Sequence, residues 1–296
     1  MKLRKKKSLT SATAGRRRFA SAVAGLAAMF AANAAFADSH TGYRFSPVKQ
    51  YGIALTADYW NPIIRYVSAK SGIPLTLKIG RTSADTTTFV LAKEVDIVFT
   101  NHLFSPEREK LGWKLFGRRK TEPVSGVIVV PDDSPVRELV QLAGKSVVFP
   151  GPEATVAYRF TYGQLLTRDI AVQTIFAGNM DAALVQMFSG RAAAAGANSQ
   201  LVEGYALREN KKYRTLWASE PLHDLALMAA SHVPAKDIDR LGLAFFAMNG
   251  NPEGRAILKS VSVKVGLTED AYFISSNGSE YAPYRRFYLT APAQVR

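Results

Sequence analysis

Hydroxyl side chains are concentrated in residues 81–88, which read Arg-Thr-Ser-Ala-Asp-Thr-Thr-Thr. This segment joins an expected strand at residues 75–79 to an expected helix at residues 83–93. The start of a helix offers unpaired backbone N–H groups and the positive end of the helix dipole, which favour an anion, and hydroxyls add further donors. The segment therefore predicts an anion-binding turn. Simple capping of the helix by Ser83 or Asp85 is the alternative.

Two other places carry polar groups in a similar position. Residues 150–155, Pro-Gly-Pro-Glu-Ala-Thr, also connect an expected strand to an expected helix. A plain connection, with Pro152 suited to a helix start, is the alternative there. His102 directly follows an expected strand, and of the four histidines it is the one that we expect near a ligand, although a structural role fits as well.

Catalytic, nucleotide-binding and metal-binding patterns are missing from the sequence. Gly144-Lys145-Ser146 lacks the earlier glycine of a phosphate-binding loop and precedes a strand instead of a helix. No G-x-S-x-G elbow is present, and no two histidines have metal-ligand spacing. Cysteine is absent, which excludes thiolate chemistry and disulfides. We therefore expect no catalytic residue, no cofactor and no metal site.

The positive charge is concentrated at the beginning of the chain. Residues 1–37 hold eight of the 38 Lys and Arg residues and none of the 24 Asp and Glu residues. The formal net charge of +14 therefore falls to +6 for residues 38–296. This mild excess suits an anionic ligand, although a solubilising surface charge explains it equally well. The basic residues form no block with interleaved aromatics, so nucleic acid is not an expected partner.

Residues 1–37 are typical of a cleavable export signal. A basic stretch precedes residues 19–32, which are apolar but too few and too rich in alanine to span a bilayer. Ala35-Phe36-Ala37 then matches the small-x-small cleavage pattern. The pair Arg16-Arg17 resembles a twin-arginine signal, with the general secretory route as the alternative. Without a cysteine for lipid attachment, we expect a soluble periplasmic protein.

Strand and helix patterns alternate along the remainder of the chain. Strands are expected at residues 75–79, 95–100, 124–130, 146–149 and 225–230. Helices are expected at residues 58–71, 83–93, 134–142, 153–167, 180–189, 200–210 and 235–248. This rhythm is typical of an α/β protein with largely parallel sheets. Junctions near residues 131–133 and 219–221 predict two lobes joined by two crossovers.

Five segments carry a recognisable order and spacing. They are YWNP at 59–62, LAKEVDIVFTNH at 91–102, LAGKSVVF at 142–149, residues 182–190, and PEGR at 252–255 with Leu258. Together they resemble the phosphate/phosphonate-type solute-binding proteins of ABC transporters, over most of residues 43–290. The resemblance implies a type II periplasmic binding protein, which has two α/β lobes, two hinge crossovers and a ligand cleft between the lobes.

The expected lobes and site follow from this resemblance. Lobe I would comprise residues 38–131 and 223–296, and lobe II residues 132–222. The ligand would contact helix N-termini from both lobes, which close by hinge motion. The contacts that we expect are Tyr51, Thr82, Ser83, Thr86, Asn101, His102, Thr155 and Tyr158.

The second-lobe loop departs from the family's pattern. Where the family commonly has Ser-Thr-Ser-Gly, residues 154–157 read Ala-Thr-Val-Ala, so only Thr155 keeps a hydroxyl. Met180 stands near the family's histidine, and Ala193 stands near its aspartate. An aminophosphonate held by an amine–carboxylate pair is therefore not expected.

The resemblance implies a small phosphate- or phosphonate-like anion as ligand and an ABC permease as partner, for a protein that we expect to be a monomer. A sensory subunit that reports the ligand to a histidine kinase is the alternative. An exported hydrolase is a third hypothesis, but the sequence contains no catalytic motif that would support it.

Overall fold

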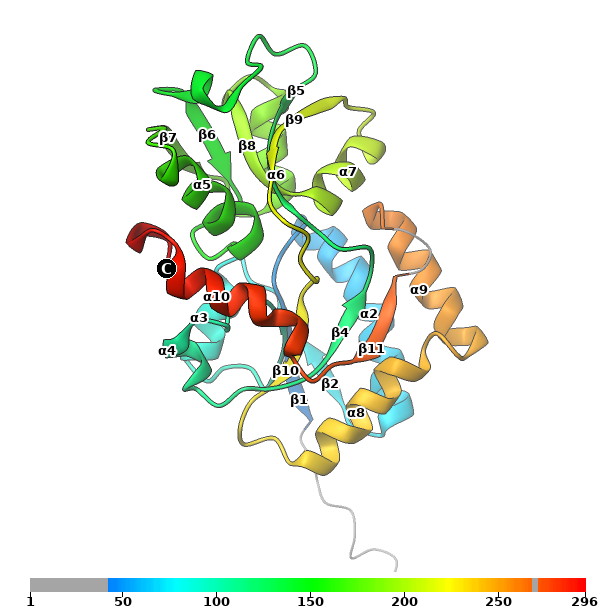
Figure 1. Ribbon diagram of the computed structural model, residues 1–296. Helices are drawn as coiled ribbons and strands as arrows, with labels where there is room; N and C mark the ends of the chain where they lie inside the picture. Colours follow the sequence, from blue (N-terminus) through cyan, green and yellow to red (C-terminus); the bar gives the residue numbers. More distant parts are fainter. Residues whose placement is uncertain (1–41, 268–270) are drawn as a thin grey trace, which may run out of the picture. The chain divides into compact units, whose positions relative to one another are not determined.

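The computed structural model describes residues 42–267 and 271–296, and the expected export signal lies outside them. Within these ranges, no helix is long and apolar enough to cross a membrane. Figure 1 shows two sheets, each flanked by helices. We call the six-stranded sheet with its helices lobe I, and the five-stranded sheet with its helices lobe II.

The sheet of lobe I has the strand order β11-β4-β10-β3-β1-β2. Its strands are β1 (Tyr43–Pro47), β2 (Leu75–Leu77), β3 (Ile97–Thr100), β4 (Lys114–Lys120), β10 (Ala226–Ala229) and β11 (Tyr272–Ser275). Only the neighbours of β1 run parallel to it, and the remaining pairs are antiparallel. The ends of β1 and β3 therefore meet at one edge of the sheet.

The sheet of lobe II has the strand order β7-β6-β8-β5-β9. Its strands are β5 (Gly126–Pro131), β6 (Ser146–Phe149), β7 (Gln173–Phe176), β8 (Ala194–Asn198) and β9 (Tyr213–Ala218). β6 pairs in parallel with β7 and β8, whereas β5 pairs antiparallel with β8 and β9. The expectation of largely parallel sheets is therefore wrong, because strands that follow a crossover enter each sheet in the opposite direction.

Helices cover both faces of each sheet. Those of lobe I are α2 (Ile53–Ser71), α3 (Asp85–Leu91), α4 (Pro106–Glu109), α8 (Ala235–Ala247), α9 (Pro252–Val265), α10 (Ala282–Thr290) and the short turns η3 (Ser279–Tyr281) and η4 (Ala293–Val295). Those of lobe II are η1 (Leu139–Leu142), the π-helical turn η2 (Thr155–Phe160), α5 (Thr161–Thr167), α6 (Met180–Phe188) and α7 (Ser199–Arg208).

Two expected helices differ in the structure. The helix expected at residues 58–71 begins earlier, at Ile53, since the apolar run before it is part of α2. The helix expected at residues 134–142 is reduced to η1. Arg214 donates to the carbonyl oxygens of Ser134 (3.0 Å) and Val136 (2.7 Å), so these carbonyls are already paired outside a helix.

The first lobe boundary also differs from the expectation. Residues 126–131 were expected in lobe I, but they form β5, an almost fully buried strand between β8 and β9 of lobe II. The chain therefore crosses at residues 121–125 and returns at residues 219–225. The expected boundary between residues 222 and 223 lies within the return. The two crossovers pair with each other, as Val124 and Leu222 exchange backbone hydrogen bonds of 2.8 and 2.7 Å.

The C-terminal segment adds a third connection beside the crossovers. Tyr281 and Tyr284 donate their hydroxyls to the carbonyl oxygens of Asp224 (2.7 Å) and His223 (2.6 Å), in the returning crossover. Farther along, Arg159 of lobe II donates to the carbonyl oxygen of Val295 at 3.2 Å. The phenyl rings of Phe160 and Phe287 stack at 4.2 Å, so α10 also packs against lobe II.

Candidate functional site

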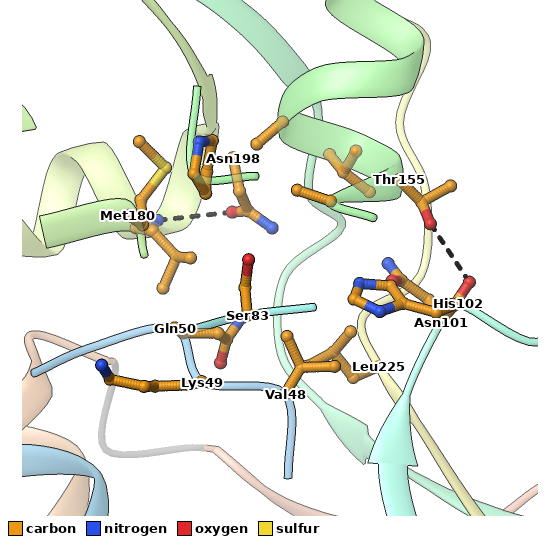
Figure 2. A pocket seen from close by; sticks show the side chains of 15 residues that line it. Val48, Lys49, Gln50, Ser83, Asn101, His102, Thr155, Met180, Asn198 and Leu225 are labelled. Carbon is orange, nitrogen blue, oxygen red and sulfur yellow. Dashed lines mark hydrogen bonds between the residues drawn. The ribbon is translucent and has the colours of Figure 1, made fainter. Parts of the chain in front are cut away.

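A small pocket of about 50 Å³ lies between the lobes, where strand ends of lobe I face helix N-termini of lobe II (Figure 2). Eight lining residues are apolar and seven are polar. They are Val48, Lys49, Gln50, Ser83, Asn101, His102, Pro150, Ala154, Thr155, Val156, Ala157, Met180, Asn198, Leu201 and Leu225. Since a cavity needs about 10–15 Å³ to hold one water, the space suits a group of only a few non-hydrogen atoms.

The lobe I wall of the pocket consists of side chains at the ends of two strands and in one turn. Residues 48–50 follow β1, and Asn101 and His102 follow its parallel neighbour β3. Ser83 comes from the turn before α3. In Figure 2, Asn101 and His102 lie opposite Met180 and Asn198 across the pocket.

His102 is held as a neutral imidazole. Its side chain is 1% exposed, and its Nδ1 pairs with the Thr87 hydroxyl at 3.1 Å. Burial is the main reason that the pKa of His102 is lowered to about 3; the charge of Glu153 opposes this shift, and those of Arg108 and Arg159 add to it. This bond uses Nδ1, the ring nitrogen opposite Nε2. A neutral ring can offer Nε2 to a ligand without adding a charge.

Ser83 presents a buried hydroxyl that has no partner among the described residues. The residue is 2% exposed and lines the pocket. The turn that carries it is fixed from both ends. The Asp85 carboxylate accepts from the backbone N–H of Arg81 (2.6 Å) and from the Thr82 hydroxyl (2.8 Å). Lys49 donates its Nζ to the carbonyl oxygen of Arg81 at 2.5 Å.

The lobe II wall consists mainly of helix N-termini. The π-helical turn η2 begins at Thr155, and the first N–H groups of a helix have no acceptor within it. This turn packs closely on the sheet, because a Cβ at Gly196 would lie 2.5 Å from the carbonyl oxygen of Ala157. The helices α6 and α7 also begin at the pocket, through Met180 and Asn198. Their dipoles add a positive potential there.

Several hydrogen bonds cross directly from one wall to the other. The backbone N–H of Met180 donates to the carbonyl oxygen of Gln50 at 3.2 Å, and that of Ser83 donates to Gly178 at 2.8 Å. The Thr155 hydroxyl donates to the carbonyl oxygen of Asn101 at 3.3 Å, as Figure 2 shows. The backbone N–H and hydroxyl groups that join the two walls are therefore donors of the kind that also bind anions.

Four of the eight expected contact residues line the pocket. They are Ser83, Asn101, His102 and Thr155. The structure does not place Tyr51, Thr82, Thr86 or Tyr158 along it.

The four remaining residues are engaged elsewhere. Thr82 donates to Asp85, and Thr86 donates to the carbonyl oxygen of Pro47 at 2.8 Å. The buried ring of Tyr51 lies 5.8 Å from the guanidinium of Arg208. Tyr158 stacks on Tyr162 at 5.3 Å and also contacts the ring of Phe149 at 5.0 Å.

Lys49, Gln50, Met180 and Asn198 also line the pocket, although none of them was expected there. Lys49 and Gln50 follow β1, a strand that was not expected. Asn198 caps α7 by accepting from the backbone N–H of Gln200 at 3.0 Å, and it ends a strand too rich in alanine to predict. An asparagine directly before an amphipathic helix was the available signal.

The chemistry of the pocket is that of binding by mainly neutral donors. Among its lining residues, only Lys49 is charged, and burial lowers the pKa of that amine. The described residues contain no group of three His, Asp or Glu side chains that could hold a metal ion. With an amine, hydroxyls, amides and helix N-termini but no carboxylate, the lining suits an anion and not a cation.

The fold and the pocket between the lobes define a two-lobed solute-binding protein. A family model for the periplasmic substrate-binding protein of phosphonate ABC transporters matches residues 46–269, which is more than half of the chain. The chain therefore belongs to this family, whose members are solute-binding proteins and not enzymes.

Solved structures show the same fold at low sequence identity. A binding protein component of an ABC phosphonate transporter from Pseudomonas aeruginosa has a TM-score of 0.71 and 14% identity, over 83% of this chain and 85% of that one. PhnD1 from Prochlorococcus marinus, in complex with methylphosphonate, has a TM-score of 0.69 and 14% identity, over 82% and 95%. A Xanthomonas citri protein bound to ATP has a TM-score of 0.63 and 12% identity, over 83% and 95%. No match was found among curated proteins.

Proposed function

We propose that this protein captures a small phosphonate-like oxyanion in the periplasm and delivers it to an ABC permease. The observation that carries the proposal is the buried, unpartnered hydroxyl of Ser83 in a small pocket between two lobes. A buried polar group without a partner costs free energy, which a ligand oxygen would remove. The family match favours this transport role over the sensory one.

The lining supports a ligand with an anionic head and a small apolar remainder. Helix N-termini, Lys49 and the Ser83 hydroxyl would take the oxygens, while Val48, Met180 and Leu225 offer apolar contact. Methylphosphonate has five non-hydrogen atoms and fits the small volume. An aminoalkyl group would bring a cation to a lining without a carboxylate, which leaves that cation without a counter-charge.

Thermal denaturation with added ligands tests the proposal. We expect methylphosphonate to raise the melting temperature, because a ligand that binds only the folded state stabilises it. The larger, cationic 2-aminoethylphosphonate should have a much smaller effect. Phosphate and phosphite are the matched anions without carbon. If none of the four compounds changes the melting temperature, the oxyanion proposal is wrong.

Ser83→Ala is the variant that tests the anchor. Removing a hydrogen bond to a charged ligand costs about 1.5–3 kcal/mol, which corresponds to about a 10- to 150-fold loss of affinity. Thr88→Ala is the matched control, since Thr88 is an exposed hydroxyl of the same segment outside the pocket. Titration calorimetry with methylphosphonate compares the two variants. Equal affinities would remove Ser83 from the site.

A further inference from the structure

Arg208, at the end of α7, joins the two lobes through contacts outside the crossovers. Its Nη1 donates to the carbonyl oxygen of Val265, the last residue of α9 in lobe I, at 2.9 Å. Its Nη2 donates to the Asp181 carboxylate of its own lobe at 2.9 Å. The last carbonyls of a helix have no partner within it and carry the negative end of the dipole, so they attract a guanidinium.

One helical turn before Arg208, the two backbones touch without room for a side chain. A Cβ on Gly204 of α7 would lie 2.8 Å from the carbonyl oxygen of Val265. A Cβ on Gly266 would lie 2.5 Å from the Cα of Gly204. We call residues 204 and 208 of lobe II with residues 265 and 266 of lobe I the rim contact. This contact forms only at the present separation of the lobes, because backbone atoms of both lobes are in direct contact.

The rim contact connects to the pocket through Asp181. This residue is the second of α6, directly after the pocket residue Met180. Its carboxylate accepts from the backbone N–H of Gly52 in lobe I, next to the bond between Met180 and Gln50. Burial raises the pKa of Asp181, and the charge of Arg208 opposes that shift. Arg208 therefore stabilises the carboxylate that ties α6 to lobe I.

We propose that Arg208 is a positioning residue, which holds the lobes together at the rim contact and so keeps the N-terminus of α6 in the pocket. Its hydrogen bonds go to Val265 and Asp181, neither of which lines the pocket, so it acts through Asp181 and through the distance between the lobes. This goes beyond the proposed function, because closure at the rim contact depends on no particular ligand.

The distance between the lobes can be measured with spin labels, since the chain has no cysteine of its own. Ala256→Cys on α9 of lobe I and Lys212→Cys after α7 of lobe II are exposed positions for a label pair on the side of the rim contact. Pulsed electron–electron double resonance would compare the distance distribution between the labels in this protein and in its Arg208→Met variant, in the absence of added ligand. We expect Arg208→Met to add a population at a longer or broader distance, and Arg208→Lys to restore part of the original distribution.

Arg214→Met is the matched control. Arg214 also belongs to lobe II and donates to three carbonyl oxygens, those of Asp132, Ser134 and Val136, all within lobe II. We expect it to lower the melting temperature without changing the label distance. An unchanged distance in Arg208→Met, or the same change in both arginine variants, would overturn the proposal.

Gly204→Ala provides a second variant in case Arg208→Met folds poorly. Alanine favours a helix interior over glycine, so α7 itself should become more stable. Its Cβ would nevertheless separate the lobes, so the label distance should increase. With methylphosphonate, we expect affinity to fall on the order of tenfold in both rim variants, as for one lost charge-assisted hydrogen bond. A distance change without any methylphosphonate binding would leave this proposal standing and count against the proposed function alone.

Discussion

The two walls of the pocket present hydrogen-bond donors in different ways. The lobe I wall uses side chains, chiefly Ser83, Asn101 and His102, and the last two are held by hydrogen bonds within their own lobe. The lobe II wall uses the beginnings of helices, where backbone N–H groups are the hydrogen-bond donors in place of side chains. The comparison teaches that a wall with mostly apolar side chains, as at residues 154–157, can still present backbone donors to a ligand.

The lobe I wall depends on a buried ion pair, and breaking it should have the largest effect on stability. Arg119 is 1% exposed and donates its Nε to the Asp224 carboxylate at 2.7 Å, next to the pocket residue Leu225. Arg119→Met leaves that carboxylate buried without a partner, which should cost about 3–5 kcal/mol of unfolding free energy. Urea denaturation measures the loss.

The double variant Arg119→Met with Asp224→Leu is the control for this experiment. Replacing both members of a buried pair by apolar residues is often neutral, so most of the stability should return. If the double variant is as unstable as Arg119→Met, packing and not charge holds this wall.

The lobe II wall can be tested by removing a backbone donor. Thr155 is the first residue of η2, and Ala154 before it has an extended backbone with ψ of 95°, which suits a residue preceding proline. Thr155→Pro removes both the N–H and the hydroxyl, whereas Thr155→Val removes the hydroxyl alone. We expect Thr155→Pro to bind methylphosphonate about 10-fold more weakly than Thr155→Val, as for one hydrogen bond to a charged ligand. Equal affinities in calorimetry would show that this N–H is not a ligand contact.

The buried imidazole predicts a pH dependence specific to the lobe I wall. Because the pKa of His102 is lowered to about 3, its contribution to stability is complete above the unfolded value of about 6.5 and is lost as the pH falls toward 3. Between pH 7 and pH 5 the loss should be about 2 kcal/mol.

His102→Gln cannot take up this proton, so its unfolding free energy should fall by about 2 kcal/mol less than that of the unsubstituted protein between pH 7 and pH 5. Urea denaturation at both values makes the comparison, and parallel losses would mean that His102 reaches solvent.

The side-chain wall was easier to predict from the sequence than the backbone wall. Ser83, Asn101 and His102 stand out because a polar residue follows an apolar strand or opens a helix. Met180 gives no such signal, since its contribution is its position at the start of α6 and not its thioether. The strands 43–47 and 194–198 were missed for a related reason: one carries a polar and a charged residue, and the other is mostly alanine.

The lobe boundary shows a second limit of the sequence. Pro131-Asp132-Asp133 has the composition of a junction, and in the structure it is a turn at the end of β5. Which sheet a strand joins depends on partners such as β8 and β9, which lie tens of residues farther along the chain. Local composition carries no information about that choice.

The C-terminal helix α10 tethers the lobes to each other beside the returning crossover. Figure 1 shows α10, which bonds to the returning crossover, on the left of the view, whereas α7 and α9 lie on the right. A rotation about the tethered side displaces groups in proportion to their distance from it. The bonds near Asn101 would then lengthen little, while the opposing glycines at 204 and 266 would move farthest apart. That edge is therefore the expected entrance for a solute.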